Sequence, residues 1–447
     1  MKKLLNKSSV LIVVMILTLL VSACGSNNGN TTVNQPKNND KGNETTDGAV
    51  KQETIKLKFY AQYSGAEIAV YDAARDALKE VMPEVEIEFE VAGQDDEQKI
   101  KTYAAAGNLP DIFFASSALI QTFKNSDNLL VLDDIVAELD IESKLNESSK
   151  AMLWNEDGKS YTIPNVGQWA GLMYYNKDLF AEHNVKVPEN FDEYLTAVET
   201  FSAAGITPLA LFAKEKWPGL LLLDMATTGH EPGGLRKIDK GEGTFSDAAY
   251  VQAAKKIETL VAAGLLSKNA FNTTADDAKA QFTSGKAAMY VNGAWSMGSV
   301  AEVMGDSVGI LYTPFSDAGQ EEAVKWNVSG GGFNQGFSVA KNTKHPEVAS
   351  KYAALFALEF AKQRVLLLAD PNSILVEEVV PVNGLTPLQQ QYADDSKNFK
   401  TMTSFAWGIE NAKLKTEAED IAQVLLSGES ADKVVEKMVK AIENSRK

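Results

Sequence analysis

Ile55-Lys-Leu-Lys-Phe59 opens the part of this sequence that decides the fold, and Glu67–Met82 and Val85-Glu-Ile-Glu-Phe-Glu-Val91 complete it. In the first and last stretches apolar side chains alternate with charged ones, which is the pattern of a strand with one buried face. The middle stretch carries apolar residues at helical spacing and stops at Pro83. The order strand, helix, strand predicts a βαβ unit, and such units build parallel sheets.

Similar short apolar runs recur along the rest of the chain. We predict further strands at residues 111–115, 171–175, 287–291, 308–312 and 336–340. Helical spacing dominates from His345 onward and ends in an amphipathic helix between Val434 and Ile442. Strands spread this widely do not fit one sheet, so the sequence predicts an α/β protein with two α/β lobes.

The composition limits the class of partner. The chain has 447 residues, a formal net charge of −17 and 45% hydrophobic residues. Its Lys and Arg side chains are scattered, so nucleic acid and anionic lipid surfaces should be repelled and are not expected as partners. The length exceeds one typical domain of roughly 100–200 residues, in agreement with two lobes.

The N-terminus has the three parts of an export signal. Basic residues come first, an apolar run from Val10 to Val21 follows, and small residues precede Cys24. The run is shorter than the roughly 20 apolar residues that span a bilayer, so residues 1–23 are predicted to be a signal peptide. Residues 24–52 hold mostly Asn, Thr, Gly and Lys with little to bury, which predicts a flexible linker.

Cys24 is the only cysteine of the chain, so a disulfide framework is excluded. Val21-Ser-Ala-Cys24 resembles the lipobox of bacterial lipoproteins, in which the thiol receives a diacylglyceryl group and the cysteine becomes the new N-terminus. The resemblance implies lipidation of Cys24, with acyl chains such as palmitate, on the outer face of a Gram-positive cell membrane. Two acyl chains suffice for stable anchoring. The alternative is a buried structural cysteine behind an ordinary signal peptide.

Motifs for catalysis, metals or cofactors are missing from the sequence. The three histidines stand apart and no Cys/His cluster exists, so neither a metal nor a cofactor is expected. The phosphate-binding glycine motifs and the G-x-S-x-G nucleophile motif are absent as well. Adjacent carboxylates such as Asp133 and Asp134 could serve glycoside hydrolysis, but such pairs arise by chance among 60 acidic residues. We predict no catalytic residue, and a flexible turn at Gly330–Gly332.

Aromatic residues beside polar ones follow the ends of several predicted strands. Tyr63 follows Gln62, and Trp295 comes shortly after the strand at 287–291. In open α/β sheets ligands lie beyond the carboxyl ends of the strands. An aromatic face suits the C–H face of a sugar ring, and Asn, Gln, Asp and Glu suit its hydroxyl groups. The sequence therefore favours a carbohydrate site, with core packing of the same rings as the alternative.

A resemblance to a known family is carried by Leu109–Phe113, Gly171–Phe180, Gln281–Trp295, and Gly336–Ala340 with His345-Pro-Glu347. In these segments the chain resembles a family 1 extracellular solute-binding protein, the lipoprotein receptor of an ABC sugar importer, related to maltose-binding protein. The resemblance implies a type II periplasmic-binding-protein-like fold. In that fold two lobes joined by crossover strands close on a ligand by hinge motion.

The resemblance also implies where the lobes begin and end. The N-terminal lobe would hold residues 53–172 and 312–373, and the C-terminal lobe residues 173–311 and 374–447. Hinges would lie at Gly171–Asn176, Gly309–Pro314 and Ser373–Pro381.

Carried over by position, Trp295 matches the tryptophan that stacks on a sugar ring. Trp169 stands where the maltose relative has a ligand-binding glutamate, and Trp407 resembles a late aromatic of the cleft. Ser116 and Ser117 replace a loop that bears Trp and Asp, and these departures argue against maltose itself. The full set of predicted ligand-binding residues is Gln62, Tyr63, Ser116, Ser117, Trp169, Trp217, Trp295, Asn327, Phe333, Trp407 and Glu410.

The predicted function is that of a monomeric, lipid-anchored receptor outside the cell. It would capture a carbohydrate, foremost an oligosaccharide, and deliver it to the permease subunits of an ABC importer. Two other classes stay open. A secreted carbohydrate-active enzyme would turn over oligosaccharides, and a surface polysaccharide adhesin would have no permease genes beside its own.

Overall fold

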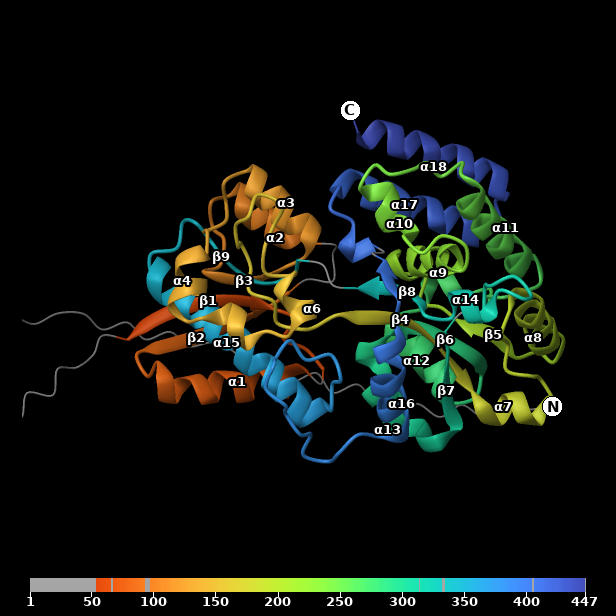
Figure 1. Cartoon of the computed structure of the whole chain (residues 1–447), viewed down its shortest axis with the longest axis horizontal. Coiled ribbons are helices and arrows are strands. Elements are labelled where there is room, and N and C mark those ends of the chain that lie inside the picture. Colours follow the sequence, from red (N-terminus) through yellow and green to blue (C-terminus); the bar gives the residue numbers. More distant parts are fainter. Residues whose placement is uncertain are drawn as a thin grey trace, which may run out of the picture. The chain divides into compact units, whose positions relative to one another are not determined.

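The predicted βαβ unit forms one half of the first sheet (Figure 1). β1 (Ile55–Ala61) pairs in parallel with β2 (Val85–Val91), and α1 (Glu67–Val81) connects them. The register places Phe59 beside Phe89, so the apolar residues of both strands line the same face. The helical spacing of α1 buries Val70, Tyr71, Ala74 and Leu78. The prediction for this stretch is confirmed.

The structure is a computed structural model that describes residues 54–446, apart from residues 66, 93–96, 313, 332–333 and 404–405. The predicted signal peptide, the linker and Phe333 therefore lie outside the described residues. Among the residues described, no helix combines the length and the apolar character needed to cross a membrane.

The first sheet has the strand order β2-β1-β3-β9. β3 (Ile112–Ala115) runs parallel to β1, and β9 (Gly336–Val339) is antiparallel to β3. Both strands lie where the apolar runs at 111–115 and 336–340 predict them.

Helices cover both faces of this sheet, α1 and α15 (Pro346–Leu368) on one side and α2 (Gln98–Ala105) and α3 (Ser117–Asn125) on the other (Figure 1). The alternation of β1 explains the arrangement, because successive side chains of a strand point to opposite faces. The ring of Phe59 lies 5.0 Å from that of Phe356 on α15. The next side chain, Tyr60, packs with the cluster that includes residues of α2 and α3. We call this sheet and its helices the first lobe.

The second sheet has the strand order β10-β8-β4-β6-β5, and β7 pairs with β4. β6 and β7 are antiparallel to β4, whereas β5 is parallel to β6. The strands are β4 (Trp169–Asn176), β5 (Thr207–Ala210), β6 (Ala287–Gly293), β7 (Val308–Leu311), β8 (Asn327–Gly331) and β10 (Thr401–Thr403). The strands predicted at 171–175, 287–291 and 308–312 are confirmed. We call this sheet and its helices the second lobe.

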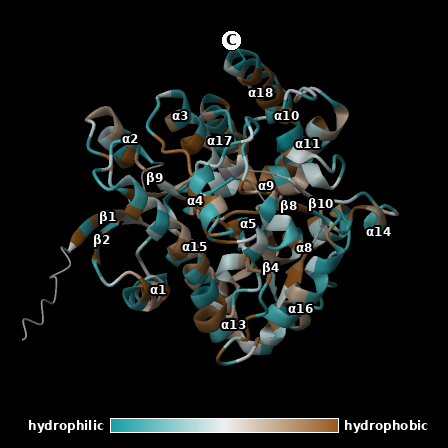
Figure 2. Cartoon of the chain, turned by 60° about the vertical axis from the view of Figure 1, so that its left-hand side comes forward, coloured by the Kyte–Doolittle hydropathy of each residue, from teal (hydrophilic) through white to brown (hydrophobic). Residues whose placement is uncertain are grey.

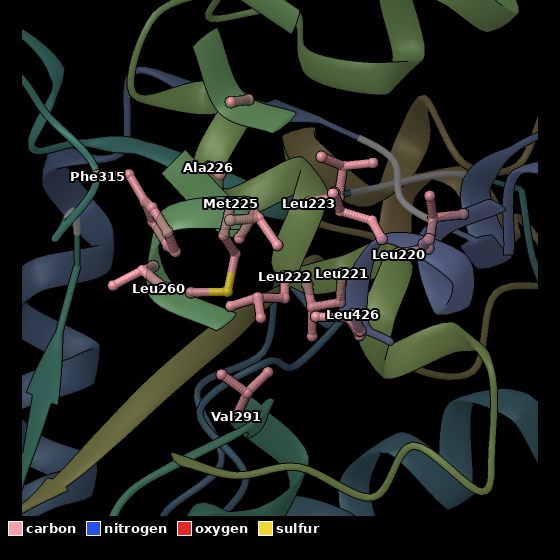
Figure 3. Packing of buried hydrophobic residues seen from close by; sticks show 14 of the residues in the cluster. Leu220, Leu221, Leu222, Leu223, Met225, Ala226, Leu260, Val291, Phe315 and Leu426 are labelled. Carbon is pink, nitrogen blue, oxygen red and sulfur yellow. The ribbon is translucent and has the colours of Figure 1, made fainter. Parts of the chain in front are cut away.

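α9 (Trp217–Thr228) forms the centre of the larger core of the second lobe. Every residue from Pro218 to Thr228 is buried, which explains why the helix has no polar face. Figure 3 shows its leucines, 220–223, grouped with Leu260 of α11, Val291 of β6 and Leu426 of α17.

The other helices are mostly amphipathic, and Figure 2 shows apolar and polar colours along the same helices, α18 among them. α18 (Ala431–Ser445) buries Val434, Met438 and Ile442, as predicted. The remaining α-helices are α4 (Asp133–Glu138), α5 (Ile141–Lys144), α6 (Glu147–Lys150), α7 (Lys177–Glu182), α8 (Phe191–Ala203), α10 (Gly234–Asp239), α11 (Ala248–Ala262), α12 (Ala275–Thr283), α13 (Met297–Met304), α14 (Glu321–Val324), α16 (Pro387–Asp395) and α17 (Ala412–Leu426).

The cores and the sheets of the two lobes locate two passages of the chain between them. Val166, just before β4, packs against the cores of both lobes, so the chain changes lobe there. We expected it to return to the first lobe at residue 312, but β8 belongs to the second sheet, and the return lies between Gly331 and Gly336. The turn expected at Gly330–Gly332 is wrong for Gly330 and Gly331, which are strand residues that pair with Ala170 and Trp169. Gly332 lies outside the described residues.

Candidate ligand-binding site

The end of β6 is a rigid platform that carries Trp295. β6 stops at Gly293, and the short helix η2 (Ala294–Ser296) turns the chain there. The Gly293 N–H donates to Asn292 Oδ1 at 2.9 Å. The Gly293 carbonyl accepts from the Tyr174 hydroxyl at 2.8 Å and from Ser296 Oγ at 3.0 Å. With both of its polar groups engaged, the backbone below Trp295 cannot shift easily.

Three rings follow the carboxyl ends of β5 and β6, which are parallel and so end at one edge of the sheet. The ring centroids of Trp217 and Trp295 lie 5.9 Å apart, with the planes at 54°. Phe212 meets Trp217 edge-on at 5.1 Å, and Trp217 Nε1 donates to Glu215 Oε2 at 2.9 Å. Both tryptophans are half-buried. We call Phe212, Trp217 and Trp295 the aromatic corner.

The start of β4 lies beside this corner. Gly171 pairs with Gly293, and Trp169 pairs with Gly331 of β8. The backbone of Trp169 thus runs between the end of β6 and the end of β8, on the edge where the corner lies. For Trp169 and Trp407 the structure describes the backbone and not the side chain, so their predicted contacts with a ligand stay predictions.

Asn327 is not brought to the corner. It is 4% exposed at the opposite end of β8 from Gly331, and its amide Nδ2 donates to the Thr228 carbonyl at 3.4 Å. Strands rise about 3.3 Å per residue, so the length of β8 separates Asn327 from the strand end that pairs with Trp169.

The predicted residues of the first lobe are engaged within the fold. The Tyr63 ring stacks on Phe89 at 4.9 Å, and its hydroxyl donates to Asp72 at 2.9 Å. Burial and the hydrogen bond to Asp72 raise the pKa of Tyr63. Gln62 is exposed after β1.

The serines after β3 are buried and hydrogen-bonded. Ser116 caps α3, because its Oγ accepts from the Leu119 N–H at 3.3 Å. Ser117 Oγ donates to the Asn334 carbonyl at 2.6 Å, and Asn334 Nδ2 donates to the Trp154 carbonyl at 3.1 Å. Ser117 thus helps to hold the passage from β8 to β9 on the first lobe.

Residues of both lobes line a polar cavity of about 520 Å³. Glu410, from the predicted set, is one of them. The sequence reasoning missed the other lining residues, which come from α3, from the loop after α6 and from the segments around α10 and α17, namely Gln121, Thr122, Asn125, Glu156, Asp239, Asn411, Ala412 and Lys413. Side chains of this kind can hydrogen-bond the hydroxyl groups of a ligand.

Lys240, at the end of α10, links this cavity wall across the lobes. Its ammonium donates to Glu156 of the first lobe at 2.8 Å and to Glu410 of the second at 3.1 Å. Burial lowers the pKa of Lys240, but the hydrogen bonds to the two glutamates outweigh it and leave the pKa above its ordinary value. The partners are 84 and 170 residues away, so no sequence pattern marks them.

Asp224 of α9 is a buried carboxyl in the second lobe. It accepts from Ser329 of β8 at 2.5 Å, from the Leu235 N–H at 2.7 Å and from Thr403 of β10 at 3.2 Å. Burial raises the pKa of Asp224 to about 7, although each of these bonds lowers it. The sequence signal that could have marked it is a single ionisable residue inside the apolar helix α9.

In the described part of the chain, no group of three or more His, Cys, Asp or Glu side chains is placed to hold a metal ion.

Two curated relatives are similar over most of the chain. One is the multiple sugar-binding protein of Streptococcus mutans, 23% identical over 333 residues, which cover 70% of this chain and 74% of that protein. The other is an uncharacterized ABC transporter extracellular-binding protein of Pyrococcus horikoshii, 25% identical over 369 residues, or 80% of each chain.

Solved structures share the fold. A protein from work on xylan utilization by Caldanaerobius polysaccharolyticus superposes with a TM-score of 0.77 at 26% identity, over 86% of this chain and 99% of that one. A chitin oligosaccharide binding protein gives a TM-score of 0.75 at 23% identity, over 88% and 99%. The sequence model for bacterial extracellular solute-binding proteins matches residues 27–362, and with this match over more than half of its length the chain belongs to that family.

Proposed function

We propose that this protein is the carbohydrate receptor of an ABC importer, and that it binds its ligand between the two lobes. The observation that carries the proposal is the aromatic corner, in which Trp217 and Trp295 lie at the carboxyl ends of two parallel strands. Half-buried indole rings at such an edge suit the C–H faces of sugar rings. The names of the relatives, a multiple sugar-binding protein and a chitin oligosaccharide binding protein, support the same class of ligand.

The two parts of the site would divide the recognition. Trp217 and Trp295 would bury the apolar face of a sugar, and Trp169 and Trp407 would add further aromatic contacts. The polar groups around the cavity, Glu410 and Lys240 among them, would bind the hydroxyl rim. A ligand that touches both lobes favours the closed arrangement by the contacts it makes only there. We take the two sheets with their helices as the lobes that move.

The proposal includes the position of the receptor in the cell. Residues 1–23 would direct export, Cys24 would carry the lipid, and residues 24–52 would tether the body to the outer face of the membrane. A single tethered monomer would then deliver the sugar to the permease subunits. Cys24→Ser should move most of the protein from the membrane fraction to the medium, and retention of the variant on the membrane would contradict the lipid anchor.

A thermal-shift screen tests the ligand class. We would use xylotriose, chitotriose, raffinose and galactose, with amino acids and short peptides as the contrast. A ligand at 100 times its dissociation constant adds about 2.7 kcal/mol to stability, which is a readily measured shift. A shift with one saccharide, lost in Trp295→Ala, is expected. Shifts with a peptide alone would contradict the carbohydrate proposal, and release of shorter sugars by the purified protein would favour an enzyme instead.

A further inference from the structure

We propose that Gly293 is a positioning residue of the ligand site, because its missing side chain leaves the space that the indole ring of Trp295 occupies. The role of the ring in ligand binding rests on the function proposed above. The placement of the ring by Gly293 does not, and it can be tested without any ligand.

The contact geometry excludes a side chain at position 293. A Cβ built on Gly293 would lie 1.9 Å from Cζ3, 2.1 Å from Cη2 and 2.3 Å from Cε3 of Trp295. Non-bonded carbon atoms approach each other to about 3.5–4.0 Å. A methyl group at position 293 and the six-membered ring of Trp295 therefore cannot both keep their places.

The glycine is not required by its own backbone. Gly293 has φ −116° and ψ 175°, an extended conformation that any residue adopts. Its carbonyl accepts from the Tyr174 hydroxyl and it pairs with Gly171 of β4, so a shift of the strand end would break contacts with β4. The ring has to move instead.

Movement of the ring would disturb the rest of the aromatic corner. Trp217 contacts Trp295 and is itself held by Phe212 and by the hydrogen bond from its Nε1 to Glu215. A displaced Trp295 ring loses this contact and presents a different surface to the cleft. Gly293 would thus act on ligand binding only through Trp295, and this dependence separates it from a residue that merely stabilises the fold.

Near-UV circular dichroism tests the placement without ligand, because it reports the surroundings of tryptophan rings. Gly293→Ala should change the tryptophan signal of the folded protein. The same substitution in a Trp295→Ala background should leave the spectrum of that background unchanged. The matched control is Gly298→Ala on α13, where a Cβ would meet its nearest atoms at an ordinary 3.6 Å and the spectrum should stay that of the wild type.

Affinity provides the second readout, with xylotriose, chitotriose and raffinose as the probes in calorimetry. For any probe that binds the wild type, Gly293→Ala should bind at least tenfold more weakly and Gly298→Ala within twofold. If none of the probes binds the wild type, the proposed ligand class fails, while the spectra still decide whether Gly293 places the ring.

Two spectral outcomes would overturn the proposal, and a third case would be decided by a double variant. The first is a Gly293→Ala spectrum identical to that of the wild type. The second is a spectral change of equal size with and without the Trp295 ring. The third case is that the Gly293→Ala protein does not fold, and the double variant then decides. Folding of the Gly293→Ala, Trp295→Ala double variant would then support the steric argument, and its failure to fold would show that the backbone itself needs glycine.

Discussion

In the first lobe, Ser116 and Ser117 follow β3 and are 7% and 3% exposed, with both hydroxyl groups hydrogen-bonded inside the protein. In the second lobe, Trp217 and Trp295 follow β5 and β6 and are half-buried. Both pairs lie at the carboxyl ends of parallel strands, where ligands bind in open α/β sheets. The two pairs differ in their side chains. The hydroxyl of a serine at a helix start is occupied by a hydrogen bond with the helix, whereas part of a large indole ring stays exposed and can contact a ligand.

The largest effect should come from the second lobe. Trp295→Ala removes the ring that follows β6, and loss of its buried area should cost about 2 kcal/mol or more, which is roughly thirtyfold in affinity. Calorimetry with the saccharide found in the screen measures it. Trp326→Phe is the control, because the Trp326 ring packs on Tyr312 at 5.2 Å within the second lobe. Near-native affinity in a folded Trp295→Ala protein would place that ring in the core and remove the contrast between the lobes.

The buried carboxyl of Asp224 should make the stability of the second lobe depend on pH. Its pKa is raised from about 3.9 in the unfolded chain to about 7. A raised pKa means that the protonated form stabilises the fold at low pH, and that this stability is lost as pH rises through 7. Between pH 5 and pH 7 the loss is about 2 kcal/mol. Urea unfolding at these two pH values measures it.

Asp224→Asn should remove this loss, because a neutral amide can keep all three hydrogen bonds by donating to Ser329 Oγ. Asp394→Asn is the control. Asp394 has a lowered pKa beside Lys397 and should leave the slope between pH 5 and pH 7 unchanged. A slope in Asp224→Asn equal to that of the wild type would show that this carboxyl stays ionised in the fold.

Ser116→Ala tests the first-lobe side of the comparison. Loss of the cap on α3 should lower the free energy of unfolding by about 1 kcal/mol. Affinity of the folded variant should stay within twofold, because the hydroxyl serves the helix. Chemical unfolding and calorimetry on the same preparation separate the two effects. A tenfold loss of affinity at unchanged stability would make Ser116 a ligand contact and would equalise the lobes.

The fold could be predicted from the sequence wherever the pattern of side chains along one segment reports their burial. The alternation of Ile55–Phe59 and Val85–Val91 predicts strands because each side chain reports its own burial. Gly330 and Gly331 carry no such signal, and only pairing with β4 makes them strand residues. The three-residue strand β10 went unpredicted for a similar reason, since β8 supplies its partner from more than 70 residues earlier in the chain.

The candidate site shows the same limit. Trp217 and Trp295 could be predicted as candidates because their residue type carries the chemistry, and the structure brings their rings together. The residues of the polar cavity were mostly missed, because Gln121, Glu156 and Lys413 become neighbours only when the lobes fold and meet. Common polar residues acquire a role from their position, and distant pairings set that position.

The smallest effect should come from the ion pair that Lys240 of the second lobe forms with Glu156 of the first. Glu156→Gln removes the ion pair from Lys240 to the first lobe and leaves the pair with Glu410 in the second. The Glu156 side chain is 75% exposed, so screening limits the pair to a few tenths of a kcal/mol up to about 1 kcal/mol. If the pair favours the closed arrangement, its loss weakens binding by about threefold at low salt and by nothing measurable at 1 M NaCl. Glu189→Gln breaks a similar exposed pair with Lys186 inside the second lobe and should leave affinity unchanged at either salt concentration. A loss of tenfold or more that persists at high salt would instead make Glu156 a direct ligand contact, and the first lobe would then hold a polar half of the site to match the aromatic half of the second.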